Sequence, residues 1–141
     1  MNAAARPVVT LEAFEAGTLD AEAFDHESHV YVGWLYLESL PLLEAIRRYS
    51  AALRRLTEQL GVPEKYHETI TWFYLLLIAE RRRITRGHGW FAFRSENDDL
   101  FHAARVLGRY YSKKLLMSDR ARKAFVLPDR LEDTPTVRTD P

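Results

Sequence analysis

The sequence contains no cysteine among its 141 residues, which excludes disulfides, thiolate nucleophiles and zinc sites built from cysteine. It also lacks long hydrophobic runs. The most apolar stretch, residues 72–79, is far shorter than the roughly 20 residues that span a bilayer. The first 25 residues hold no apolar segment of the signal-peptide type. From these absences we expect a soluble protein located in the cytoplasm.

An excess of charge of one sign is absent as well. The 20 lysine and arginine residues balance the 20 aspartate and glutamate residues, which gives a formal net charge of zero with neutral histidine. The molecule as a whole therefore has no field that attracts nucleic acid or an anionic membrane, and either partner would need a local patch. We expect a small-molecule substrate or ligand instead. Whether the chain forms a homodimer is left open by the sequence.

What the sequence does contain is the periodicity of helices. Hydrophobic residues make up 47% of the chain, and over residues 42–60 they recur at alternating spacings of four and three, as on the buried face of a bundle helix. We predict one all-α domain over residues 10–128, with a flexible arm at 1–9 and a disordered tail at 129–141. Its architecture is an up-down four-helix bundle with short extra helices near both termini. The main helices are expected at 26–40, 42–60, 63–83 and 95–116, with an aromatic-rich loop over 84–97 before the fourth.

Three histidines form the candidate site. In an up-down bundle the first and third helices run parallel, so their N-termini lie at the same end. His26 and His29 lie in the first turns of the first helix, and His67 and Glu68 lie near the start of the third. Neutral imidazole binds Fe, Zn, Mn, Ni and Cu, and histidines three apart on a helix can share one ion. The pattern predicts a mononuclear metal site with ligands His26, His29 and His67, and Gly33 leaves room beside it.

Catalytic roles follow from this placement. Three protein ligands leave coordination positions of a divalent transition metal open for water, dioxygen or substrate. The metal would then act as a Lewis acid or activate water or dioxygen. We expect Glu68 as a further ligand or catalytic carboxylate, and Thr71 as a hydrogen-bond partner one turn beyond His67. Tyr36 and Tyr74 are the other polar candidates. The sequence thus predicts a small metal-dependent enzyme acting on a small molecule.

Two alternatives stay open for the same histidines. They can line a metal-free pocket of a non-enzymatic ligand- or partner-binding module, as acid–base or hydrogen-bonding groups. They can also be structural, with their nitrogens satisfied inside the fold. A separate feature is the arginine cluster within residues 81–86, which could dock a partner but is also typical of a helix C-terminus, where cations complement the helix dipole.

Two segments carry a resemblance to known proteins. Residues 24–30 (FDHESHV) and 66–71 (YHETIT) resemble segments of small bacterial all-α proteins with HxxH and YHET motifs. The arrangement is also similar to that of the DinB-like four-helix proteins, whose three metal-binding histidines lie at one end of a bundle. This likeness implies a metal site at the bundle end. Those proteins place one histidine early and an HxxxH pair late, whereas here an HxxH pair comes first. The thiol-dependent transferase activity of part of that group is therefore not carried over.

Overall fold

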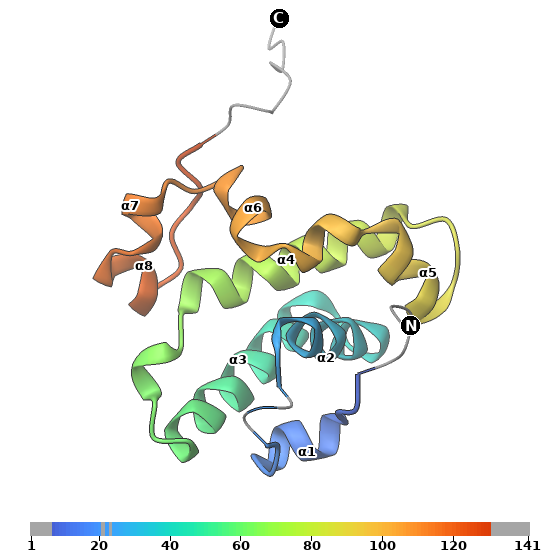
Figure 1. The fold of residues 1–141 in the computed structure, drawn as a ribbon, viewed down its shortest axis with the longest axis horizontal. Helices are drawn as coiled ribbons and strands as arrows, with labels where there is room; N and C mark the ends of the chain where they lie inside the picture. Colours follow the sequence, from blue (N-terminus) through green and yellow to red (C-terminus); the bar gives the residue numbers. More distant parts are fainter. Residues whose placement is uncertain (1–6, 21, 23, 131–141) are drawn as a thin grey trace, which may run out of the picture.

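The computed structural model describes residues 7–20, 22 and 24–130. This part of the chain forms helices and no strand, so the predicted all-α class is confirmed. None of its helices combines the length and the apolar composition needed to cross a bilayer. In chain order (Figure 1) the helices are α1 (Leu11–Ala16), α2 (His26–Ser39), α3 (Leu42–Gln59), η2 (Pro63–Lys65), α4 (Glu68–Ile84), α5 (Gly89–Glu96), η3 (Asp98–Phe101), α6 (Ala103–Gly108), α7 (Lys113–Leu116) and α8 (Asp119–Lys123).

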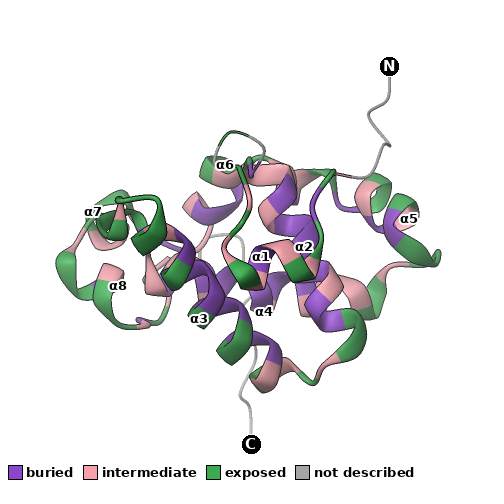
Figure 2. Cartoon of the chain, turned by 90° about the horizontal axis from the view of Figure 1, so that it is seen from below, coloured by how far each residue is buried: buried purple, intermediate pink, exposed green. Residues whose placement is uncertain are grey.

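The three long helices α2, α3 and α4 form the centre of the fold. α2 begins where the sequence predicts, because the Asp25 carboxylate accepts a hydrogen bond (2.9 Å) from the backbone N–H of Ser28 and caps the helix. α2 is buried around most of its circumference, as its scarcity of charged residues predicts. α3 buries only one face, and buried and exposed residues alternate along it (Figure 2). The buried face consists of Ala45, Ile46, Tyr49, Ser50, Ala52, Leu53 and Leu56.

α2 and α4 run in the same direction, but they are staggered. Near the start of α2 the His26 ring packs edge-on against the Tyr74 ring, with ring centroids 5.2 Å apart. Near its end the Leu37 carbonyl accepts a hydrogen bond (3.0 Å) from the Arg82 guanidinium. The N-terminal residue of α2 therefore lies beside the middle of α4. His67 precedes Tyr74 by seven residues, which corresponds to about 10 Å along a helix axis.

The predicted loop over residues 84–97 is wrong for its second half. Residues 89–96 form α5 because Trp90 and Phe93 share one face of a helix and pack on the aromatic side chains of α2. The Trp90 ring centroid lies 4.8 Å from that of Tyr31 and 5.6 Å from that of Trp34. The burial of these rings stabilises a helix here, although the glycines at positions 87 and 89 disfavour one.

The predicted fourth long helix is also wrong, and an up-down four-helix bundle is not confirmed. Residues 95–116 are divided among the end of α5, η3, α6 and α7. The carbonyl of Leu100 accepts hydrogen bonds from the Tyr74 hydroxyl (2.7 Å) and from the His26 ring (3.0 Å). A carbonyl bound to α2 and α4 in this way cannot also continue a regular helical ladder. The chain is therefore anchored to the core at η3 instead of running past it as a helix.

The two ends of the chain differ in part from the predicted arm and tail. Val9 is buried, while residues 1–6 lie outside the described residues. The Asp129 carboxylate accepts hydrogen bonds from the backbone N–H and the hydroxyl of Ser112, both at 2.7 Å. The start of the predicted tail thus contacts the turn before α7. Residues 131–141 lie outside the described residues.

Candidate functional site

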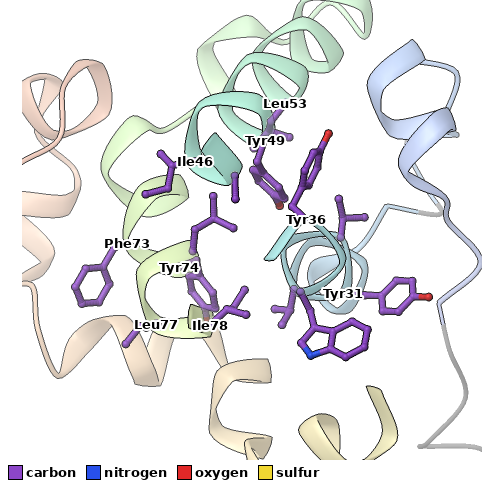
Figure 3. Packing of buried hydrophobic residues seen from close by; sticks show 14 of the residues in the cluster. Tyr31, Tyr36, Ile46, Tyr49, Leu53, Phe73, Tyr74, Leu77 and Ile78 are labelled. Carbon is purple, nitrogen blue, oxygen red and sulfur yellow. The ribbon is translucent and has the colours of Figure 1, made fainter. Parts of the chain in front are cut away.

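A cavity of about 300 Å³ lies between α2, α3, α4 and α6. Five polar side chains reach it, and among the described residues that line it none carries a carboxylate, an ammonium or a guanidinium group. Figure 3 shows buried hydrophobic side chains of this region, among them the cavity residues Tyr49, Leu53, Tyr74 and Ile78. The polar residues are His26, His29, Tyr49, Thr71 and Tyr74, and the apolar ones are Val30, Leu53, Ile70, Leu75, Ile78, Ala103 and Leu107.

His26 is held at the N-terminus of α2 by the carbonyl of Leu100. Its Nε2 atom lies 3.0 Å from that oxygen, and because a carbonyl only accepts hydrogen bonds, Nε2 must carry the proton. In the neutral ring, Nδ1 is then the nitrogen with a lone pair. Tyr74 donates to the same Leu100 oxygen, so one carbonyl orients two of the five polar groups.

His29 is held by the backbone in the opposite tautomer. Its Nδ1 atom lies 2.8 Å from the Asp25 carbonyl oxygen and donates to it, so the lone pair is on Nε2. Phe24 covers the imidazole, with ring centroids 4.0 Å apart. Burial lowers the pKa of His29; the hydrogen bond to Asp25 raises it, and the nearby His26 lowers it further. The positive end of the α2 dipole also disfavours a protonated ring. His29 is therefore a neutral acceptor at pH 7.

His67 has a structural position in which both of its ring nitrogens are engaged. Nε2 donates to the Leu116 carbonyl (2.8 Å), and Nδ1 accepts a hydrogen bond (3.2 Å) from the backbone N–H of Ile70. The ring is thus the N-cap of α4. His67 lines a second hollow, of about 580 Å³, which adjoins the cavity at His29 and Thr71. Among the described residues, no three His, Cys, Asp or Glu side chains are grouped so that they could hold one metal ion.

We expect His67→Ala to lower the free energy of unfolding by about 1 kcal/mol, the usual cost of losing an N-cap side chain. His67→Asn is the matched variant, because asparagine can accept the same hydrogen bond from Ile70 and should recover most of the loss. Urea unfolding of the two variants and of the wild-type chain measures the difference. Equal losses in both variants would show that the contact with Leu116, rather than the cap, holds α4 at this end.

Two of the predicted catalytic residues lie away from the cavity. Glu68 accepts hydrogen bonds from the Arg54 guanidinium (3.0 Å) and from the hydroxyl of Tyr66, in a groove between α3 and α4. The Tyr36 hydroxyl donates to Glu15 of α1 (2.6 Å), and its burial and that carboxylate raise its pKa above the ordinary value. Both side chains are engaged in holding helices together. Neither is among the described residues that line the cavity.

Thr71 does line the cavity, but its hydroxyl donates to the backbone carbonyl of His67 (2.7 Å) and not to the ring. Tyr49 is the polar residue that sequence reasoning missed, because its spacing assigns it to the apolar seam of α3. Its hydroxyl donates to the carbonyl of His29 (3.1 Å). The one available signal is that a tyrosine with a polar hydroxyl stands in an otherwise aliphatic seam. Nothing in the sequence marks the carbonyl of Leu100 as part of the site.

The arginine cluster within residues 81–86 is largely paired inside the fold. The Arg81 guanidinium binds Asp99 with two hydrogen bonds of 2.8 Å, and Arg109 contacts the same carboxylate. The other ion pairs of the cluster join Arg82 to Glu38 and Arg83 to Glu80. These contacts explain most of the cluster by intramolecular pairing.

Comparisons with models of protein families, with curated proteins and with solved structures yield no match to this chain.

Proposed function

We propose that the protein binds a small, uncharged and largely apolar molecule in the cavity beside His26 and His29. The observation that supports this most is a cavity of about 300 Å³ with apolar walls, into which a few polar side chains are fixed by hydrogen bonds to backbone carbonyls. Small-molecule sites commonly combine apolar walls with a few placed polar groups, over a range of about 300–1,000 Å³.

The lining of the cavity carries no formal charge, which favours an uncharged ligand. A buried ionic group is stable only when an opposite charge or several hydrogen bonds compensate the lost hydration. No described residue that lines the cavity supplies a formal charge at pH 7 when the histidines are neutral. Lys65 and Glu68 face the neighbouring hollows instead. A ligand with a formal charge would therefore be bound poorly here.

Two alanines on α6 test the proposal. Ala103 lines the cavity and is half-buried, whereas the next residue, Ala104, is exposed and is not among the lining residues. Phenol serves as the probe, titrated while the ring signals of His26 and His29 are followed by NMR. We expect Ala103→Phe to fill the cavity and weaken phenol binding at least about tenfold, the equivalent of about 1.4 kcal/mol. Ala104→Phe should leave it unchanged.

Two results would contradict the proposal. One is that neither phenol nor cyclohexanol binds the wild-type protein saturably. The other is that Ala103→Phe and Ala104→Phe bind phenol equally well, since the ligand would then occupy another place.

A metal-dependent enzyme is a second candidate, and one observation favours it. In His26 and His29 one nitrogen each, Nδ1 and Nε2 respectively, has no hydrogen bond from a described residue, and such lone pairs bind transition metals. His67 would have to release two hydrogen bonds to become the third ligand.

Metal analysis of untagged protein after exposure to Fe, Zn, Mn, Ni and Cu distinguishes the two candidates. Near-stoichiometric metal that disappears in His29→Ala would support the metal site. Phenol binding without bound metal would support the metal-free pocket.

A further inference from the structure

We infer that the cavity selects ligands that donate hydrogen bonds, such as alcohols, phenols and neutral amines, over ligands of the same shape that only accept them. This inference rests on the proposed function, because it assumes that a small molecule occupies the cavity. It concerns the direction of the hydrogen bonds that the polar side chains can still form.

The three hydroxyl groups of the cavity already donate their hydrogens to backbone carbonyls. Tyr49 donates to His29 (3.1 Å), Tyr74 to Leu100 (2.7 Å) and Thr71 to His67 (2.7 Å). Each hydroxyl has one hydrogen and two lone pairs, so only acceptor capacity is left. Burial raises the pKa of Tyr49 and of Tyr74, which keeps both phenols protonated and these bonds in place.

The two imidazoles are in the same condition. A neutral imidazole carries one N–H, and here it is directed to a backbone oxygen, of Leu100 for His26 and of Asp25 for His29. The nitrogen left over in each ring is an acceptor. With both rings neutral, every polar side chain that lines the cavity in the described part of the chain has its hydrogen engaged within the protein. What these side chains present to a ligand is a set of lone pairs.

A ligand must fit this set between largely apolar walls. An O–H or N–H of the ligand can pair with an imidazole nitrogen or a hydroxyl oxygen. An ether or carbonyl oxygen would face other acceptors and lose its bonds to water without replacement, which is the costly case for a buried polar group. The first turn of α2 also has backbone N–H groups that are not bonded within the helix and can donate. The N–H of Ser28 is one of them, and it already donates to the Asp25 carboxylate.

Three aromatic probes of similar size separate the possibilities. Phenol donates and accepts, anisole only accepts, and toluene does neither. We expect phenol to bind the wild-type protein about 10- to 100-fold more tightly than anisole, from the cost of an unpaired buried group. Anisole should bind no more tightly than toluene. Cyclohexanol and cyclohexanone form a second pair, in which the alcohol should bind more tightly.

Replacing His29 by phenylalanine removes one lone pair and keeps a planar ring beside Phe24. We expect this variant to bind phenol and anisole with affinities that differ less than in the wild-type protein, while toluene binding shows that the cavity persists. Equal binding of phenol and anisole to the wild-type protein, or tighter binding of anisole, would overturn donor selection and leave the proposed function standing. If neither phenol nor cyclohexanol binds the wild-type protein saturably, the proposed function itself fails.

Discussion

Trp90→Ala is expected to lower the free energy of unfolding by about 3–5 kcal/mol, the range for removing a large aromatic side chain from a core. Trp90 is 1% exposed. Its ring centroid lies within 6.0 Å of those of Tyr31, Trp34, Phe93 and Phe101. Truncation removes these contacts and leaves a space that the surrounding side chains fill only in part. Since small domains are stable by only about 5–15 kcal/mol, this is a large fraction of the total.

The adjacent residue supplies a matched control for this prediction. Phe91 is 49% exposed, so Phe91→Ala should cost less than about 1 kcal/mol in the same urea titration. Trp90→Phe should fall between the two, because the indole N–H of Trp90 has no hydrogen-bond partner among the described residues and no such bond is lost. If Trp90→Ala costs no more than Phe91→Ala, the packing of α5 on α2 is wrong.

Trp90→Ala should also weaken phenol binding, although Trp90 does not line the cavity. Phe101 packs on Trp90 and directly follows Leu100, whose carbonyl orients His26 and Tyr74. Loosening Phe101 therefore disturbs the two polar groups at that side of the cavity. α5 thus supports the site from a distance.

Local signals in the sequence were sufficient for α2 and α3. The predicted start of the third helix at residue 63 is wrong, because Pro63–Lys65 form the separate η2 and α4 begins only after its cap His67. The carboxylate of Asp25 caps α2 and proline at position 41 precedes α3, and both features act within a few residues of the helix start. The seam of α3 is visible because its spacing follows from the helix geometry alone. These predictions required no knowledge of what each helix packs against.

The segment over residues 95–116 could not be predicted in this way, because its structure depends on residues far away in the sequence. The hydrogen bonds that hold the Leu100 carbonyl come from Tyr74, which lies 26 positions earlier in the sequence, and from His26, which lies 74 positions earlier. A window of residues around Ser95 shows a helix-start pattern and an apolar stripe, but it does not contain His26 or Tyr74. Tertiary contacts therefore override a local preference for one continuous helix.

The candidate site was predicted in part for a related reason. The sequence indicates that α2 and α4 run in the same direction, and it places His26 and His29 on one face of α2. It does not contain the register in which the two helices meet. In the structure that register sets His26 beside Tyr74 and leaves His67 as the cap of α4. One missing quantity, the stagger of two helices, separates a predicted cluster of three histidines from a cavity lined by two.

The close contact between α2 and α4 depends on Gly33, and Gly33→Leu is expected to lower the free energy of unfolding by about 1–3 kcal/mol, the usual cost of overpacking. A Cβ atom at this position would lie 3.0 Å from Ile78 Cδ1 and 3.0 Å from Leu75 Cδ2. Gly33 is not among the glycines with positive φ, so its role is to leave space. The sequence suggested that this space serves the candidate site. In the structure, side chains of α4 occupy it.

Gly33→Ala separates the two consequences of a side chain at this position. One methyl group requires only small shifts of the flexible ends of Leu75 and Ile78, and alanine gains about 1 kcal/mol of helix propensity over glycine, so the net change should be near zero. Leucine must displace both side chains, and because both also line the cavity, Gly33→Leu should weaken phenol binding while Gly33→Ala preserves it. Urea unfolding and the phenol titration measure the two effects independently. A Gly33→Leu variant with wild-type stability and affinity would mean that α2 and α4 are not in tight contact at Gly33, and the stagger that separates His26 from His67 would need another cause.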